Sequence, residues 1–252
     1  MNTLKVPAGL RQARVPLPEH LLGFLQAEVA RFSKSISVPR PWHYSELHNP
    51  WSRAAAVFDS WGFLDVCQSS TVIENVGRLI GPDIVLFDSQ WLPDRWHPIE
   101  AESALESDAH RFPVDPPVGV TVLIAVAGVP RGILRVDYRD SKLGTAAKQQ
   151  VSASLELEPG TILVLDSRLA YRVRCARSSS VVPAALAMRY FPASSRYSRD
   201  PTAPVHRTLT ERYPLINYAR LPLWLVNGED RADNDFVTGF NVRAGYWTNS
   251  RW

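Results

Sequence analysis

The residues best suited to chemistry lie in one polar, irregular stretch of the chain, residues 91 to 116. Its polar and aromatic side chains include Trp96, His97, Glu100, Glu106, Asp108 and His110. A carboxylate can act as a general base, and burial beside a second carboxylate would raise its pKa toward neutrality. His110 could carry protons at neutral pH, although a lone loop histidine is more often structural. The stretch therefore predicts acid–base chemistry if the fold gathers these groups into one pocket.

The signatures of several other enzyme classes are absent from the sequence. It contains no Gly-rich phosphate loop, and residues 227–230 (NGED) are typical of a simple turn. It contains no Gly-x-Ser-x-Gly motif, so an α/β-hydrolase mechanism has no support. Cys67 and Cys175 are far apart in the chain, which favours neither a zinc site nor a redox dithiol.

The secondary-structure elements that must position these residues start, in chain order, with helices. Apolar residues at helical spacing predict a helix that starts at Pro18–Glu19 and ends before Pro39. They are Leu21, Leu22, Leu25, Val29, Phe32 and Ile36. Further helices are expected over residues 51–58 and 70–80, the second stopped by Gly81–Pro82.

After Asp83 the pattern changes to strands. Strands are predicted over residues 83–88, 118–126, 131–137, 151–158, 160–166 and 181–191. Short strands separated by turns favour a mostly β fold with helical decoration, either a barrel or a double-sheet jelly roll.

One domain covering residues 1–252 is the expected organisation. Residues 18–80 would form the helical part, 83–191 the jelly-roll core, and 192–252 a C-terminal extension that packs on the core. The apolar run LPLWLV, residues 221–226, could either cap this core or form an interface with another chain.

The bulk composition limits the partners. The net charge is only +3 and the arginines are scattered, so nucleic acid is not an expected partner. No apolar run approaches the roughly 20 residues that span a bilayer, and the N-terminus lacks the apolar centre of a signal peptide. With two cysteines in the chain, a cytoplasmic protein with no membrane contact is expected.

The order of the segments resembles the phytanoyl-CoA dioxygenase family of Fe(II)/2-oxoglutarate oxygenases. The matching segments cover residues 48–59, 76–90, 112–126, 131–136 and 160–171. The last of these, GTILVLDSRLAY, resembles the strand that carries the distal iron ligand. The resemblance implies a double-stranded β-helix core, of the jelly-roll or cupin-like kind.

The family's functional residues are mostly replaced. A His-x-Asp pair and a distal histidine hold its iron, and an arginine binds the far carboxylate of 2-oxoglutarate. Here Glu106 replaces the first histidine, Asp108 matches the aspartate, and Tyr171, a poor ligand for Fe(II), replaces the distal histidine. The arginine position falls near residues 182–184, where none stands, and Arg189 lies further along that strand. Asp108 is thus the one family group that remains, and these departures imply a site that holds neither a metal nor a cofactor.

A second alignment with the family retains a metal site. It places His97 at the first ligand position, and His110 is another imidazole near Asp108. With a shifted loop, His97 or His110 could bind Fe(II) beside Asp108, and 2-oxoglutarate would then be the cosubstrate. Arg168 lies three residues before Tyr171 and is interpreted as scaffold or pocket rim.

The first functional hypothesis is a metal-independent enzyme with a small organic substrate, for example a secondary metabolite. It would catalyse a redox-neutral step such as cyclisation, isomerisation or elimination. Glu106 or Asp108 would be the base, Tyr171 the acid or oxyanion donor, and His110 a proton carrier. A vestigial pocket with a space-filling tyrosine is the equal alternative.

Two further hypotheses remain open. The chain could be a non-catalytic subunit that pairs with an active oxygenase, as a heterodimer, or with a second copy of itself. It could also be an Fe(II)/2-oxoglutarate hydroxylase with an atypical ligand set that uses His97 or His110.

Overall fold

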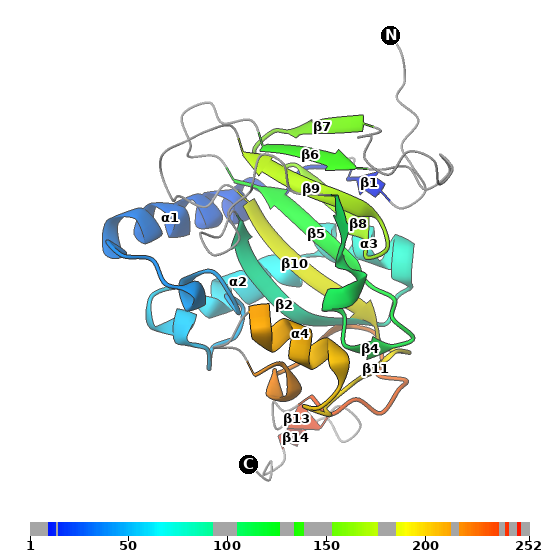
Figure 1. The fold of residues 1–252 in the computed structure, drawn as a ribbon. Coiled ribbons are helices and arrows are strands. Elements are labelled where there is room, and N and C mark those ends of the chain that lie inside the picture. Colours follow the sequence, from blue (N-terminus) through cyan, green and yellow to red (C-terminus); the bar gives the residue numbers. More distant parts are fainter. Residues whose placement is uncertain are drawn as a thin grey trace.

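The computed structural model describes residues 10–13, 15–92, 105–126, 134–138, 153–175, 185–212, 217–236, 240–241 and 246–247. Its centre consists of two antiparallel sheets that face each other (Figure 1). The larger has the order β1 (Leu10–Gln12), β8 (Ile162–Asp166), β5 (Val120–Ala125), β10 (Ala185–Pro192), β2 (Ile84–Leu92) and β12 (Trp224–Asn227). The smaller has the order β3 (Glu106–Ser107), β9 (Ala170–Cys175), β6 (Leu134–Tyr138) and β7 (Ala153–Leu157). The predicted jelly-roll core is confirmed.

Shorter elements surround the two sheets. The α-helices are α1 (Glu19–Ser35), α2 (Ser60–Cys67), α3 (Ser70–Ile80) and α4 (Pro204–Arg212). Four 3-10 helices cover Pro41–His43, Arg53–Ala56, Asp108–Arg111 and Tyr218–Arg220. Two small ribbons pair β4 (Val114–Asp115) with β11 (Arg196–Tyr197) and β13 (Phe240–Asn241) with β14 (Tyr246–Trp247). No helix among these is long and apolar enough to cross a membrane.

The larger sheet is buried on both faces because its strands alternate between two apolar clusters. One face packs on α1, α2 and α3 through side chains such as Val122, Val164 and Met188. The other face turns inward, where Leu123, Leu163, Leu165, Ala185 and Ala187 meet Val136, Tyr138 and Leu157 of the smaller sheet. Each fully buried aliphatic side chain contributes about 1.5–3 kcal/mol, so this double burial dominates the stability of the barrel.

Two of the three predicted helices are confirmed and one is wrong. α1 and α3 lie where the apolar spacing predicts them, and α3 ends at Gly81 with a positive φ of 89°. Residues 51–58 hold only the 3-10 helix Arg53–Ala56. The regular helix starts later, at α2, because the Asp59 side chain accepts a hydrogen bond from the Gly62 N–H and caps it.

The segment that resembles the ligand-bearing strand, residues 160–171, spans two strands, and the strand predicted over residues 160–166 is the first of them, β8. β8 ends at Asp166 and a turn separates it from β9, which lies in the other sheet. In that turn the Arg168 guanidinium donates to both oxygens of Asp166, at 2.9 and 2.7 Å, which agrees with a scaffold role. Tyr171 is therefore the second residue of β9.

The run LPLWLV belongs to the chain's own core. Leu221 and Leu223 are buried in an apolar cluster with Phe87, Phe112 and Phe191. β12 pairs with β2 and extends the larger sheet. The structure therefore supports the interpretation that this run caps the chain's own core. The division of the chain into one domain with three parts remains a prediction.

Candidate functional site

Of the three residues expected to share one site, Glu106, Asp108 and Tyr171, the structure brings the side chains of Asp108 and Tyr171 together. β3 pairs with β9 so that Glu106 lies opposite Tyr171 in the backbone register, and the 3-10 helix Asp108–Arg111 follows β3 directly. The Tyr171 hydroxyl donates to Asp108 Oδ2 at 2.6 Å. The side chains of Glu106 and His110, and residue His97 as a whole, lie outside the described part of the chain.

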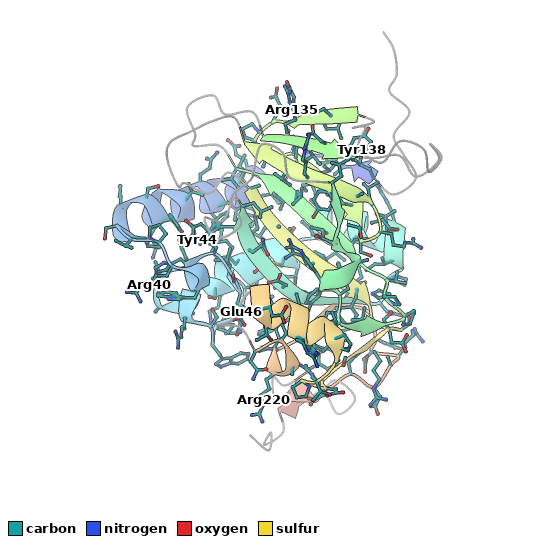
Figure 2. All side chains as sticks on the ribbon, in the orientation of Figure 1. Arg40, Tyr44, Glu46, Arg135, Tyr138 and Arg220 are labelled. Atoms are coloured by element: carbon teal, nitrogen blue, oxygen red, sulfur yellow. The ribbon has the colours of Figure 1, made fainter. Side chains whose placement is uncertain are left out.

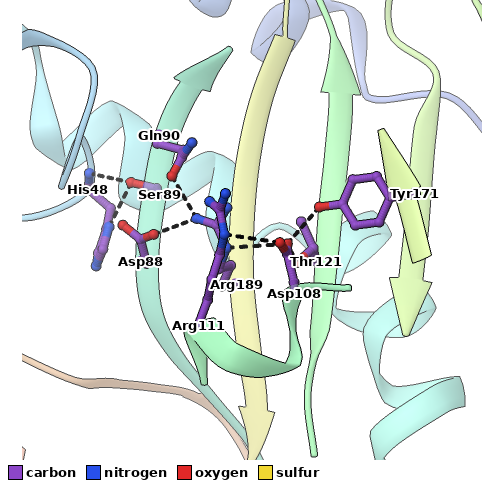
Figure 3. A network of polar contacts seen from close by, with 9 residues as sticks. All are labelled: His48, Asp88, Ser89, Gln90, Asp108, Arg111, Thr121, Tyr171 and Arg189. Atoms are coloured by element: carbon purple, nitrogen blue, oxygen red, sulfur yellow. Dashed lines mark hydrogen bonds and ion pairs between the residues drawn. The ribbon is translucent and has the colours of Figure 1, made fainter. Parts of the chain in front are cut away.

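Asp108 is the centre of a buried polar network (Figure 3). Besides Tyr171, the Thr121 hydroxyl donates to its Oδ2 at 2.8 Å. Arg111 Nε lies 3.1 Å from Oδ1, and Arg189 Nε lies 3.6 Å from Oδ2. Asp108 itself is only 5% exposed, so protein groups replace water around both of its oxygens.

Arg189 extends the network to a second carboxylate. Its Nη1 lies 2.5 Å from Asp88 Oδ2 and donates to Gln90 Oε1 at 2.8 Å. Arg189 pairs in register with Asp88 on β2 and with Thr121 on β5, so their side chains share the inward face of the sheet. Among the side chains that the structure describes here, two aspartates face two arginines, and buried charges require such partners.

Gly119 allows the 3-10 helix to approach the sheet. A Cβ at this position would clash with the Phe112 ring and with the Tyr190 carbonyl oxygen. Phe112 directly follows the 3-10 helix and is buried against Phe87 of β2. The missing side chain of Gly119 thus lets Asp108 and Arg111 reach β5 and β10.

The network sets the charge state of Asp108. Burial alone would raise the pKa of this carboxyl, but Arg111, Arg189 and the hydrogen bonds from Tyr171 and Thr121 outweigh it and hold the pKa well below its usual range. The expectation of a raised pKa is wrong for Asp108, which is therefore a weak base. Burial and the adjacent Asp108 charge raise the pKa of Tyr171, so the phenol keeps the proton that it donates.

These residues do not fit the iron site of the family that the sequence resembles. Such a site needs two imidazoles and a carboxylate with an available oxygen. The described residues instead offer a phenol, and both oxygens of Asp108 already contact protein donors. No group of three histidine, cysteine, aspartate or glutamate residues able to hold a metal occurs within the described ranges. Arg189 is engaged by Asp88 and Gln90, and residues 182–184 lie outside the described part.

The sequence patterns do not indicate a functional role for the segment that runs beside β2. Ser45 bridges to Gln90, and the Leu47 N–H donates to the Ser89 carbonyl at 3.3 Å. His48, in the same segment, is fully buried, with Nδ1 2.7 Å from Ser89 Oγ. Burial lowers the pKa of His48 to about 3, so the imidazole is neutral.

Glu46 belongs to the same segment, and its side chain is labelled in Figure 2. Burial, together with the nearby charge of Asp88, raises its pKa to about 7, against a hydrogen bond from Asn49 Nδ2 at 3.0 Å. Its backbone has a φ of 53°, a left-handed conformation that costs free energy for a residue other than glycine. A half-buried, strained residue with such a pKa is typical of functional sites.

Comparison with solved structures identifies the fold. CytC3 with Fe(II) and alpha-ketoglutarate has a TM-score of 0.57 at 17% identity, covering 96% of this chain and 93% of CytC3. The apo form of the non-heme monooxygenase ThoJ has a TM-score of 0.54 at 16% identity, covering 88% of this chain and 81% of ThoJ. The chain therefore shares its fold with CytC3, whose structure contains Fe(II) and alpha-ketoglutarate, and with the non-heme monooxygenase ThoJ.

A third neighbour shows another reaction on this fold. SnoN, a non-heme alpha-ketoglutarate-dependent epimerase from nogalamycin biosynthesis, has a TM-score of 0.53 at 14% identity, covering 75% of this chain and 80% of SnoN. At these identities the likeness concerns the fold alone. A scan against protein-family models and a search of curated proteins found no match, so membership of the phytanoyl-CoA dioxygenase family stays a prediction.

Proposed function

We propose that this chain is an iron-independent enzyme on the 2-oxoglutarate-oxygenase fold, and that it catalyses a redox-neutral step on a small organic molecule. The observation that carries the proposal is that protein side chains surround the Asp108 carboxylate. Asp108 is the one residue that matches an iron ligand of the family, and Arg111, Thr121, Tyr171 and Arg189 surround its carboxylate. An aspartate neutralised by arginines has little affinity left for a metal cation.

The proton-transfer role falls to Glu46. Its pKa of about 7 suits a group that must both accept and return a proton at neutral pH, whereas Asp108 is too weak a base. In an isomerisation, the Glu46 carboxylate would take a proton from one substrate atom and the resulting acid would return a proton to another, with no net oxidation. Glu106, opposite Tyr171 in the backbone register, is a second candidate, and His110 remains a candidate proton carrier.

The proposed class of substrate rests on the structural neighbours, because the aliphatic side chains inside the barrel, such as Leu123 and Val136, pack against each other as core. SnoN, an alpha-ketoglutarate-dependent epimerase from nogalamycin biosynthesis, supports a biosynthetic substrate such as a secondary metabolite and an isomer-forming reaction. Cyclisation, isomerisation and elimination are the reactions that need only acid–base groups.

The proposal is tested by anaerobic titration calorimetry of the purified chain with Fe(II) and 2-oxoglutarate. We expect no stoichiometric binding of iron, and no succinate when oxygen is admitted. CytC3 is the matched positive control, because its structure contains both Fe(II) and alpha-ketoglutarate. Stoichiometric iron with turnover to succinate would instead establish the hydroxylase alternative, with His97 or His110 as a ligand.

One surface feature favours a second candidate, a non-catalytic subunit that associates with an active oxygenase or with its own copy. Trp51 and Trp61 are 54% and 57% exposed, and both contact Trp224 of the edge strand β12. Grouped exposed aromatic side chains often mark protein interfaces. If this candidate is correct, light scattering after size-exclusion chromatography will show a dimer that a W51S/W61S variant loses; a monomer at all concentrations and no co-purifying oxygenase count against it.

A further inference from the structure

The surroundings of Asp108 have the features of a binding site for a carboxylate. One carboxylate receives two hydroxyl donors, Thr121 at 2.8 Å and Tyr171 at 2.6 Å, and two guanidinium groups, Arg111 at 3.1 Å and Arg189 at 3.6 Å. Charge-assisted contacts of this kind are the usual means of recognising carboxylate ligands. Two hydroxyl donors and two ion-paired arginines thus converge on a group that is itself 5% exposed.

Three of the donors are positioned independently of Asp108. Thr121, Tyr171 and Arg189 lie on β5, β9 and β10, whose places are fixed by sheet pairing. Asp108 enters from the start of a 3-10 helix outside both sheets (Figure 3). These three side chains are therefore preorganised, whereas Arg111 and the Asp108 carboxylate share the 3-10 helix that follows β3.

The charge of the network also favours an anion at this place. Arg189 is shared between Asp88 and Asp108, and Arg111 pairs with Asp108. Without the Asp108 side chain, Arg111 and Arg189 would each lose a carboxylate contact. Removing an ion-pair partner from a buried arginine is strongly unfavourable, so a replacement anion would be favoured at this place.

We propose that Arg111, Thr121, Tyr171 and Arg189 form a carboxylate-binding site that the chain keeps filled with its own Asp108, and that this site accepts a small monocarboxylate when that side chain is absent. The native Asp108 thus blocks the site against external carboxylates. The inference does not depend on the proposed reaction, since it concerns only which group fills the site.

The test is chemical rescue of the full-length Asp108→Ala variant. This change removes one carboxylate and leaves a space that matches formate. We expect formate, at about 100 times its dissociation constant, to raise the thermal midpoint of the variant by about 5–10 °C relative to the same concentration of chloride. The wild type and Asp108→Asn, in which the site stays filled, should show no shift specific to formate. Adding Tyr171→Phe to Asp108→Ala should weaken formate binding several-fold.

A second variant, tested with a second anion, provides a readout if Asp108→Ala folds poorly. Asp108→Gly removes one more carbon, so acetate should rescue it, and refolding yield in acetate against chloride gives a readout even from insoluble protein. Rescue by the matching anion in either variant supports the site. The proposal is overturned if neither variant responds to its anion beyond chloride, or if the wild type responds equally. Both results leave the iron titration of the proposed function unaffected.

Discussion

Replacing Arg189 by methionine is expected to lower the free energy of unfolding by about 3–5 kcal/mol, the largest effect of any single polar substitution in this site. The side chain of Arg189 is 3% exposed and faces Asp88 and Asp108 together. Methionine fills a similar volume but supplies no charge, so Asp88 loses its ion-pair partner and Asp108 keeps only Arg111 and two hydroxyl donors. Urea unfolding near neutral pH measures the loss.

Arg135→Met is the matched control for this experiment. Arg135 also pairs with a carboxylate, Glu156, but both side chains are about half exposed, at 44% and 53%. An exposed pair contributes about 0–1 kcal/mol, so this variant should be nearly as stable as the wild type. Equal losses in the two variants would contradict a buried, charge-balanced network.

The dependence of the Arg189→Met effect on pH gives a further check. The low pKa of Asp108 stabilises the fold above the ordinary aspartate pKa of about 4, and this contribution is lost as the pH falls. The stability difference between wild type and Arg189→Met should therefore shrink in acid.

Glu46→Gln is expected to stabilise the protein by about 2 kcal/mol near pH 8 and to leave its stability unchanged near pH 5. The pKa of Glu46 is raised from 4.5 to about 7, so the folded state binds a proton that the unfolded state releases between these values. Stability of the wild type therefore falls as the pH rises through this window. Glutamine resembles the protonated acid and can still accept from Asn49, so the variant should avoid the loss.

Thermal unfolding from pH 5 to pH 8 measures this difference, with Glu158→Gln, a change at an exposed carboxylate, as the control. The control should follow the wild type at every pH. A Glu46→Gln curve that runs parallel to the wild type would mean that Glu46 is ionised throughout, and the role of proton carrier would then pass to another residue.

The fold was largely predictable because the signals of its strands are local. The β-branched run around Val120–Ala125 and the alternation around Ala153–Leu157 each predicted a strand that the structure contains. α2 was missed because its start depends on the Asp59 cap, and the apolar spacing before that residue suggested an earlier helix. The turn after Asp166, where the chain changes sheets, depends on tertiary pairing that no short window shows.

The site was only half predictable. Asp108 and Tyr171 were placed together because the family's motif positions fix their register. Arg189 could have been found, since an arginine inside an apolar strand must be paired if that strand is buried. Which carboxylates pair with it depends on the neighbours of β10, and these are far away in the sequence. Glu46 gave no sequence signal, because its pKa and strained backbone arise only when the segment packs beside β2.

The central claim is that protein donors, rather than a metal, hold the Asp108 carboxylate. Anomalous diffraction at the iron edge, from crystals grown anaerobically with Fe(II) and 2-oxoglutarate, tests it most directly. The account predicts no anomalous peak within bonding distance of Asp108, with the phenol of Tyr171 still donating to Oδ2. A peak coordinated by Asp108 and two imidazole nitrogens would contradict it.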